Sequence, residues 1–268
     1  MRVPLPVVLC FSGHDPTGGA GIQADIETLF SFGCHPCTVI TALTEQDTVD
    51  VRGVFPQDPA VFVAQARTLL ADLQVSAVKI GLLGSADIAR VIVELLDVLP
   101  GVPVVLDPIL AAGGGHPLAS EALAAVIDEY LLPRVDVLTP NSTEARRLSG
   151  LATLDACAEH LLGRGCRRVL ITGTHEVGED VINRLYGPER VCTQRVARLP
   201  GSYHGSGCTL AAAVAGCLAL GLGIDDAALR ALSYTWDTLA AGFAAGRGQW
   251  LPNRRVTPHL SLDANWPP

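Results

Sequence analysis

The stretch Pro200-Gly-Ser-Tyr-His-Gly-Ser-Gly-Cys-Thr209 is a polar turn with three glycines, and it runs directly into the apolar segment Leu-Ala-Ala-Ala-Val-Ala-Gly-Cys-Leu-Ala-Leu220. The apolar segment predicts a buried helix over Gly207–Leu220. Gly205 and Gly207 allow consecutive backbone N–H groups to face one point, and the helix N-terminus adds unsatisfied donors and the positive end of its dipole. Such a turn suits a phosphate or the charge of phosphoryl transfer. An ordinary turn capped by Ser206 or Thr209 explains the pattern equally well.

Composition limits the classes of protein to which this chain can belong. Its 268 residues are 49% hydrophobic and 17% charged, which is enough to bury one large core. A net charge of −8 argues against a nucleic-acid or anionic-membrane surface. No apolar run is long enough to cross a membrane and the N-terminus does not have the layout of a signal peptide, so we expect a cytoplasmic protein. Lys79 is the only lysine. It does not stand in the pattern G-x-x-x-x-G-K-[ST], so the chain is not a P-loop NTPase.

The eight cysteines lie in apolar segments, as buried free thiols do. Cys34-His-Pro-Cys37 has the spacing of a redox or zinc motif. However, this pair follows a predicted helix and opens a strand, the reverse of the thioredoxin arrangement, and no second pair is present for zinc. We therefore expect neither redox nor zinc chemistry.

Short β-branched runs alternate with longer amphipathic segments along most of the chain. The runs predict buried strands at residues 5–11, 38–43, 77–83, 102–106, 135–138 and 168–171. The segments between them predict helices at residues 20–32, 59–73, 86–99, 119–131, 143–148 and 154–162. This alternation predicts a three-layer α/β/α fold with a mostly parallel central sheet.

The pattern changes after Gly173. Residues 181–186 and 190–198 predict two strands joined at Gly187-Pro188, so we expect antiparallel strands at one edge of the sheet. Helices follow at 207–220 and 225–245, and an irregular tail begins at about residue 246. No linker or repeat divides the sequence, so we expect residues 1–268 to form a single domain.

Residues 19–24 match the dinucleotide fingerprint G-x-G-x-x-A between a strand and a helix, with Glu45 available for a ribose hydroxyl. This keeps an NAD-dependent dehydrogenase as an alternative from another class. Against it, the six residues 13–18 separate strand and fingerprint, where such a turn is normally tighter. It also leaves residues 139–144 and 204–209 without a role.

Polar residues follow several predicted strands, at the edge where ligands bind in parallel sheets. Asp107 ends the fourth strand beside a glycine-rich loop, which suits magnesium and phosphate. Asn141 and Glu144, at the start of a helix, are spaced to share a hydrated magnesium, and equally to form a capping box. Gln46 can bind the edge of a heterocycle, although a solvated turn explains it nearly as well. Lys79, within a strand, needs a carboxylate partner if it is buried.

Several of these motifs occur together in a fixed order. They are Asp15-Pro-Thr-Gly-Gly-Ala-Gly-Ile-Gln-Ala-Asp25, Val39-Ile-Thr-Ala-Leu-Thr-Glu-Gln46, Val78-Lys-Ile-Gly-Leu-Leu-Gly84, Val105-Leu-Asp-Pro108, Thr139-Pro-Asn-Ser-Thr-Glu144 and His204-Gly-Ser-Gly-Cys-Thr209. In this combination, over residues 5 to 245, the chain resembles the hydroxymethylpyrimidine/phosphomethylpyrimidine kinases of thiamine biosynthesis, in the ribokinase-like superfamily. The resemblance implies a homodimer that uses ATP and Mg²⁺. It implies phosphorylation of 4-amino-5-hydroxymethyl-2-methylpyrimidine and of its monophosphate.

The resemblance also implies roles for individual residues. Gln46, Asp25, Gly13 and Leu82 would bind the pyrimidine. Asp107 and Glu144 would serve magnesium, and Asn141, Thr172 and Gly173 would bind ATP. Gly205, Ser206, Gly207 and Cys208 would form the anion hole. Cys208 at a helix N-terminus could be a partly ionised base, but we favour a contact with the acceptor hydroxyl, because the loose transition state asks little of a base.

Two departures from the family pattern concern lysines expected near phosphates. This chain has Ala112-Gly-Gly-Gly115 and Thr172-Gly-Thr-His175 at the places where many members carry a lysine. We therefore expect a reorganised phosphate site that relies on magnesium, backbone N–H groups and Thr172. The missing lysines also leave open a protein that binds the pyrimidine without catalysis. A pyridoxal-type vitamin kinase of the same fold is a further alternative, because relatives share the anion hole, although Gln46 and Cys208 favour the pyrimidine.

Overall fold

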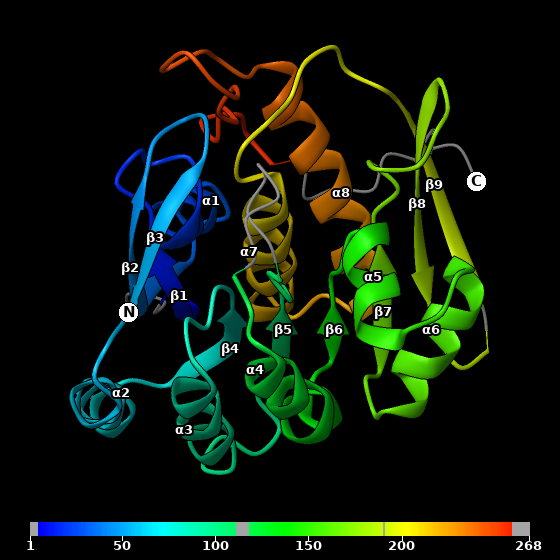
Figure 1. The fold of residues 1–268 in the computed structure, drawn as a ribbon. Helices are drawn as coiled ribbons and strands as arrows, with labels where there is room; N and C mark the ends of the chain where they lie inside the picture. The colour runs from blue at the N-terminus through cyan, green and yellow to red at the C-terminus, as the bar shows by residue number, and fades with distance from the viewer. Residues whose placement is uncertain (1–4, 111–117, 190, 259–268) are drawn as a thin grey trace.

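The sheet of this protein places its parallel strands in the middle and its antiparallel strands at both edges (Figure 1). The computed structural model describes residues 5–110, 118–189 and 191–258. Within them, nine strands form one sheet in the order β3-β2-β1-β4-β5-β6-β7-β8-β9. The strands are β1 Val7–His14, β2 His35–Gln46, β3 Val51–Pro56, β4 Val75–Ile80, β5 Val104–Leu106, β6 Val137–Leu138, β7 Arg168–Ile171, β8 Asp180–Tyr186 and β9 Val191–Ala197.

The pairing confirms the predicted mixed sheet and adds one strand. Strands β2, β1, β4, β5, β6 and β7 run parallel to one another, and β7, β8 and β9 pair antiparallel, as expected. The sequence prediction missed β3, which pairs antiparallel with β2. The short polar turn 47–50 joins the two strands, so Thr44, Glu45 and Gln46 belong to the extended β2 and not to a turn after it.

Helices cover both faces of the sheet, which confirms the three-layer α/β/α fold (Figure 1). Side chains of β1 alternate between the two faces, because successive residues of a strand point to opposite sides. Leu9 and Phe11 pack with α2 to α6, whereas Val8 and Cys10 pack with α1, α7 and α8. The helices are α1 Gly21–Ser31, α2 Pro59–Asp72, α3 Ala86–Leu96, α4 Glu121–Val126, α5 Ser142–Ser149, α6 Leu154–Gly163, α7 Ser206–Ala219 and α8 Ile224–Ala240.

Helix α7 is buried on nearly all sides. Residues 208–218 are all buried, and the helix packs between the sheet, α1 and α8. A helix that is apolar all round is stable only in such a position. The Ala-rich sequence allows the close approach, and it fixes the turn at 205–207 against the sheet.

Three predicted boundaries were wrong. The helix expected at 119–131 is α only over α4, and a π turn Ile127–Leu131 and a 3₁₀ turn Leu132–Arg134 follow it before Val135, with Pro133 inside the 3₁₀ turn. The helix expected to reach residue 245 ends at Ala240. The tail from 246 is not merely irregular, because Trp250 and Leu251 form β-bridges with Tyr203 and Phe243. Within the described residues, no helix is long and apolar enough to span a membrane.

Candidate functional site

The carboxyl ends of β1, β4 and β5 meet where the strand order changes direction. β1 connects along the chain to β2 on one side and pairs with the distant β4 on the other. Crevices at such switch points are where open α/β sheets bind ligands. Gly13 lies against Leu82 here, because a Cβ on Gly13 would be 2.8 Å from a Leu82 methyl carbon. Two of the residues predicted to bind the pyrimidine are therefore adjacent.

The glycine turn before α7 lies over this crevice. Gly205 is the N-cap, with φ of +85°, and no side chain caps the helix. Thr209 Oγ1 instead donates to the Gly205 carbonyl at 2.8 Å, so the alternative of a turn capped by Ser206 or Thr209 is wrong. A Cβ on Gly205 would collide with the carbonyl of Gly19. The turn thus requires glycine, and its N–H groups are left for a ligand.

Asp107, at the end of β5, lies directly beside this turn. A Cβ on Gly207 would lie 3.5 Å from Asp107 Oδ2. That oxygen is buried and has no hydrogen-bond partner among the described residues. Burial raises the pKa of Asp107 to about 6, against the opposing effect of Lys79. A buried carboxylate oxygen without a partner is suited to bind a cation, because burying such a group alone is costly.

Asn141 and Glu144 form the capping box of α5. Asn141 Oδ1 accepts from the Glu144 N–H at 2.9 Å, and Glu144 Oε2 accepts from the Asn141 N–H at 2.9 Å. Burial and the nearby Asp107 raise the pKa of Glu144 to about 8. The effect of Asp107 on the pKa of Glu144 places the two carboxyl groups in the same neighbourhood. Capping therefore does not exclude a second role for Glu144.

The described residues contain no cluster of three or more His, Cys, Asp or Glu side chains able to hold a metal ion by themselves. Mg²⁺ commonly binds through one or two carboxylates together with substrate phosphates and water. Asp107, with its orphaned oxygen, and Glu144 fit that donor set.

Lys79 forms a buried ion pair with Asp25. Its ammonium nitrogen lies 2.8 Å from Asp25 Oδ1 and 2.9 Å from Oδ2, and neither side chain is exposed. Burial acts to lower the pKa of Lys79, but Asp25, Cys208 and Asp107 raise it above its ordinary value, so Lys79 stays charged. The lysine has the carboxylate partner that burial requires. Asp25, predicted to bind substrate, is therefore engaged by Lys79, whose charge also acts on Asp107 and Cys208.

Cys208 follows the glycine turn as the third residue of α7 and is buried. Burial raises the pKa of its thiol to about 12, and Asp107 and Asp25 act in the same direction against Lys79. This raised pKa argues against the alternative of a partly ionised thiolate base and is in keeping with the favoured role of Cys208 as a contact for the acceptor hydroxyl. Desolvation outweighs the dipole, and a neutral thiol faces the site.

Gln46 lies at the end of β2, on the far side of β1 from Leu82. Its Nε2 donates to Thr44 Oγ1 at 2.8 Å, and Thr44 Oγ1 donates to the His14 carbonyl at 2.9 Å. This chain of hydrogen bonds ties Gln46 to the residue that follows Gly13. The structure thus places Gln46 two hydrogen bonds away from the residue that follows Gly13.

The residues predicted to bind ATP lie at the ends of β6 and β7. Asn141 and Thr172 form a parallel β-bridge, and Ser142 N–H donates to the Thr172 carbonyl at 3.0 Å. Gly173 donates to Asn183 Oδ1 at 3.2 Å, and a Cβ there would collide with the Ile182 carbonyl. These groups form an edge next to Glu144.

Sequence reasoning missed two polar side chains near the glycine turn. Asp15 Oδ2 lies 2.9 Å from His204 Nε2, and the same carboxylate accepts from the N–H groups of Thr17 and Ala20 at 2.8 Å. Burial acts to raise the pKa of Asp15, but the hydrogen bond to His204 and the Thr17 N–H lower it below its ordinary value. Arg254, from the tail, is also buried. The pattern Asp-x-Thr at residues 15–17 could have indicated the role of Asp15. Nothing in the sequence marks Arg254.

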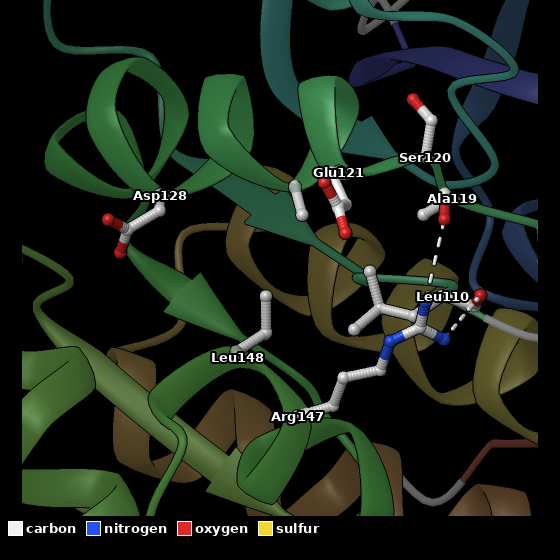
Figure 2. Close-up of a pocket in the computed structure, with 8 residues that line it drawn as sticks. Leu110, Ala119, Ser120, Glu121, Asp128, Arg147 and Leu148 are labelled. Atoms are coloured by element: carbon white, nitrogen blue, oxygen red, sulfur yellow. Dashed lines mark hydrogen bonds between the residues drawn. The ribbon is translucent and has the colours of Figure 1, made fainter.

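A cavity of about 290 Å³ lies between α4 and α5, near Glu144 but not over the glycine turn. Figure 2 shows Arg147 reaching across it, with hydrogen bonds to the carbonyls of Leu110 at 3.1 Å and Ala119 at 3.4 Å. The glycine-rich loop 112–115, predicted near phosphate, lies outside the described residues. The cavity has an apolar and charged lining without an orphaned group, so we place the chemistry at Asp107 instead.

Comparisons with known proteins agree with this geometry. The family model described as phosphomethylpyrimidine kinase matches residues 15–253. The hydroxymethylpyrimidine/phosphomethylpyrimidine kinase of Streptomyces coelicolor is 38% identical over 249 residues, covering 91% of this chain and 92% of the relative.

Solved structures extend the likeness to three dimensions. The pyridoxal kinase of Staphylococcus aureus in complex with pyridoxal has a TM-score of 0.87 at 25% identity, covering 94% of both chains. The phosphomethylpyrimidine kinase of Clostridium difficile has a TM-score of 0.76 at 31% identity, covering 88% of this chain and 100% of that one. The resemblance seen in the sequence motifs is thus confirmed: this chain is a kinase and belongs to the phosphomethylpyrimidine kinase family.

Proposed function

We propose that this protein transfers the γ-phosphoryl group of ATP to the hydroxymethyl group of 4-amino-5-hydroxymethyl-2-methylpyrimidine, and then a second phosphoryl group to the monophosphate. The observation that carries the proposal is the buried, unpartnered Oδ2 of Asp107 beside the uncapped turn at Gly205–Gly207. Phosphoryl transfer needs positioned charge and donors more than covalent chemistry. This juxtaposition of a carboxylate and an anion turn provides both.

Asp107 and Glu144 would hold magnesium, which neutralises phosphate charge when bound. The N–H groups of Gly205, Ser206, Gly207 and Cys208 would receive the charge that develops on the transferred group. The neutral Cys208 thiol is suited to contact the acceptor hydroxyl rather than to remove its proton. The edge formed by Asn141, Thr172 and Gly173 would bind ATP.

The pyrimidine would lie between Leu82 and the backbone at Gly13, with Gln46 reading its amino edge. Gln46 Nε2 already donates to Thr44, which leaves its carbonyl oxygen available to accept from an exocyclic amine. Asp25 would influence the pocket through its buried ion pair with Lys79.

The substituted lysine positions bear on the second step. Thr172 stands where many relatives have a lysine, so we propose that magnesium, backbone N–H groups and Thr172 carry the phosphate charge. The monophosphate brings additional negative charge, so the second transfer depends most on this reorganisation. Equal efficiency in forming the monophosphate and the diphosphate would contradict this point.

Pyridoxal phosphorylation is the second candidate function, favoured by the close likeness to a pyridoxal kinase bound to pyridoxal. The greater sequence identity to the Streptomyces coelicolor relative favours the pyrimidine. We further propose that the protein acts as a homodimer in the cytoplasm, as the resemblance to this family implies.

The test is a product assay. Purified protein is incubated with ATP, Mg²⁺ and either the hydroxymethylpyrimidine or pyridoxal, and products are separated by chromatography over time, with Asp107→Asn as the inactive control. We expect the pyrimidine monophosphate first and the diphosphate later. Pyridoxal phosphate alone would replace the proposal with the second candidate. Measurable pyrimidine binding without any product would reduce the protein to a binding function.

A further inference from the structure

Arg254 is a buried arginine in the C-terminal tail, far in sequence from every motif of the site. The residue is 3% exposed. Its Nη2 donates to the Gly19 carbonyl and its Nη1 to the Gly18 carbonyl at 3.4 Å. Its Nε donates to Thr209 Oγ1 at 2.9 Å, and Nη1 also pairs with Glu27 Oε2 at 3.1 Å. One guanidinium therefore contacts the loop after β1, helix α1 and helix α7.

The partners of Arg254 are parts of the two glycine turns. Gly18 and Gly19 belong to the loop that runs from Gly13, at the pyrimidine position, into α1. We call residues 13–20 the acceptor loop and residues 205–207 the anion turn. Thr209 links Arg254 to the anion turn, because its Oγ1 accepts from Arg254 and donates to the carbonyl of Gly205, the N-cap of α7. The chain of hydrogen bonds thus runs from the acceptor loop through Arg254 and Thr209 to the anion turn.

The surroundings leave this loop little freedom. A Cβ on Gly19 would lie 2.6 Å from carbons of both His204 and Leu251. His204 is tied to Asp15 of the same loop, and its backbone N–H donates to the Trp250 carbonyl. The tail, the acceptor loop and the anion turn therefore interlock, and Arg254 supplies the charged, multidentate contact among them.

We propose that Arg254 is a positioning residue that fixes the anion turn relative to the acceptor loop; this rests on the phosphoryl transfer proposed above. An arginine suits the role because its planar fork presents several donors in fixed directions and stays charged when buried. Misplacement of reacting groups by about 1 Å can reduce a rate by about 100-fold. Among the described residues, the side chain of Arg254 contacts Gly18, Gly19, Glu27 and Thr209 and neither Asn141 nor Thr172, so ATP binding should change little.

The test compares Arg254→Gln and Arg254→Lys with Arg255→Gln, a change at the exposed neighbouring arginine of the same tail. We expect Arg254→Gln to lower kcat by about 10- to 100-fold with a KM for ATP within about threefold. Arg254→Lys, which keeps the charge but not the fork, should recover only part of kcat. Arg255→Gln should match wild type. A kcat for Arg254→Gln within twofold of Arg255→Gln would overturn the proposal.

A second arm measures position without catalysis. Hydrogen exchange by mass spectrometry should show faster exchange of backbone amides in residues 18–24 and 204–210 of Arg254→Gln than of Arg255→Gln. Unchanged exchange there would overturn the proposal, even if the wild type does not phosphorylate the pyrimidine and the proposed function fails. If Arg254→Gln does not fold, Arg254→Lys and Thr209→Val replace it. The two changes should then be non-additive in log kcat and in exchange, and additivity would overturn the proposal.

Discussion

Helices α2 to α6, on one face of the sheet, each begin at a residue whose side chain accepts a hydrogen bond from the first turn, whereas α1, α7 and α8, on the other face, do not. The capping residues are Asp58, Ser85, Ser120, Asn141 and Thr153. The uncapped helices begin after Ala20, Gly205 and Gly223. Helix α8 compensates with Asp225 and Asp226 in its first turn, but α1 and α7 have no acidic residue there.

The difference shows at which helix N-termini no side chain of the N-cap residue accepts from the backbone N–H groups of the first turn. The N-termini of α1 and α7 converge, since the Gly21 N–H contacts the Cys208 sulfur and Gly205 lies against Gly19. Both ends face the buried charges Lys79, Asp25 and Asp107. A side-chain cap on α7 would occupy donors that an anion needs, whereas at α1 Asp15 and Cys208 already accept from the N–H groups of Ala20 and Gly21. On the proposed function, the capped face would serve stability and the uncapped face binding, with α5 sharing both roles.

The largest effect is expected at Lys79, beneath the uncapped helices. Lys79→Met would leave Asp25 as an uncompensated buried charge and lower the free energy of unfolding by about 3–5 kcal/mol. Lys79→Met with Asp25→Leu should recover most of this loss, because a buried pair can be replaced by apolar residues. Urea unfolding measures both. A double variant no more stable than Lys79→Met would show that the ion pair itself stabilises the fold. The kinase activity of the double variant would show separately whether Asp25 is needed for substrate binding.

Asp107→Asn should reduce kcat by about 10²- to 10³-fold, because the cation site loses its charge. The same change should stabilise the metal-free protein at pH 8. The pKa of Asp107 is raised to about 6, so the folded state holds the proton more tightly than the unfolded state. Wild-type stability from this group therefore falls as pH rises from about 4 to about 6 and stays lower above that range.

Thermal unfolding of Asp107→Asn and wild type without metal, at pH 4.5 and pH 8, measures this effect. The advantage of the variant should be larger at pH 8. An equal advantage at both pH values would mean that ionisation of Asp107 is not costly in the folded protein.

Gly207→Ala tests the uncapped turn directly. The added methyl group would lie 3.5 Å from Asp107 Oδ2, in ordinary van der Waals contact, so the protein should fold. Replacing a helical glycine can raise the free energy of unfolding by up to about 1 kcal/mol. The methyl group should reduce kcat by about 10- to 100-fold, since it occupies the anion position. Full activity together with higher stability would disprove the role of this turn.

Glu144→Gln separates the two roles of α5. Glutamine also completes a capping box, so the free energy of unfolding should be preserved. Because the pKa of Glu144 is raised to about 8, the side chain would have to ionise as it binds magnesium. Glutamine cannot ionise, so the Mg²⁺ concentration needed for half-maximal activity should rise by about 10-fold. Activity measured against Mg²⁺ concentration, beside a thermal melt, gives both answers. A large loss of stability with unchanged magnesium dependence would leave capping as the function of Glu144.

The smallest effect belongs to the capped face. Asp58 accepts from the N–H groups of Ala60 and Val61 at 2.8 and 3.1 Å. Asp58→Ala should therefore lower the free energy of unfolding by about 1 kcal/mol and leave kcat unchanged. A loss of kcat beyond twofold would mean that the two faces are not separate in function.

The parts of this molecule that follow from local pattern could be predicted from the sequence, and the parts that depend on long-range contact could not. Strand and helix alternation gave the layers, because each buried strand is a nearly continuous apolar run. β3 was missed because its residues have no clear alternation beside a polar turn. The charge state of Cys208 depends on burial by distant segments, which outweighs its visible position at a helix start. Arg254 carries no motif, and only the folded chain brings it to Gly19.

The interlocked tail has a consequence for the order in which the molecule is completed. The sheet and both helical layers use residues up to Ala240, but the contacts between Gly18, Gly19 and Thr209 through the guanidinium require residue 254. A nascent chain can therefore assemble the whole scaffold before its two glycine turns are clamped together. Because the contact between Gly18 and Arg254 closes a loop of more than two hundred residues, we expect it to form after the scaffold, since loop-closure entropy opposes such distant contacts.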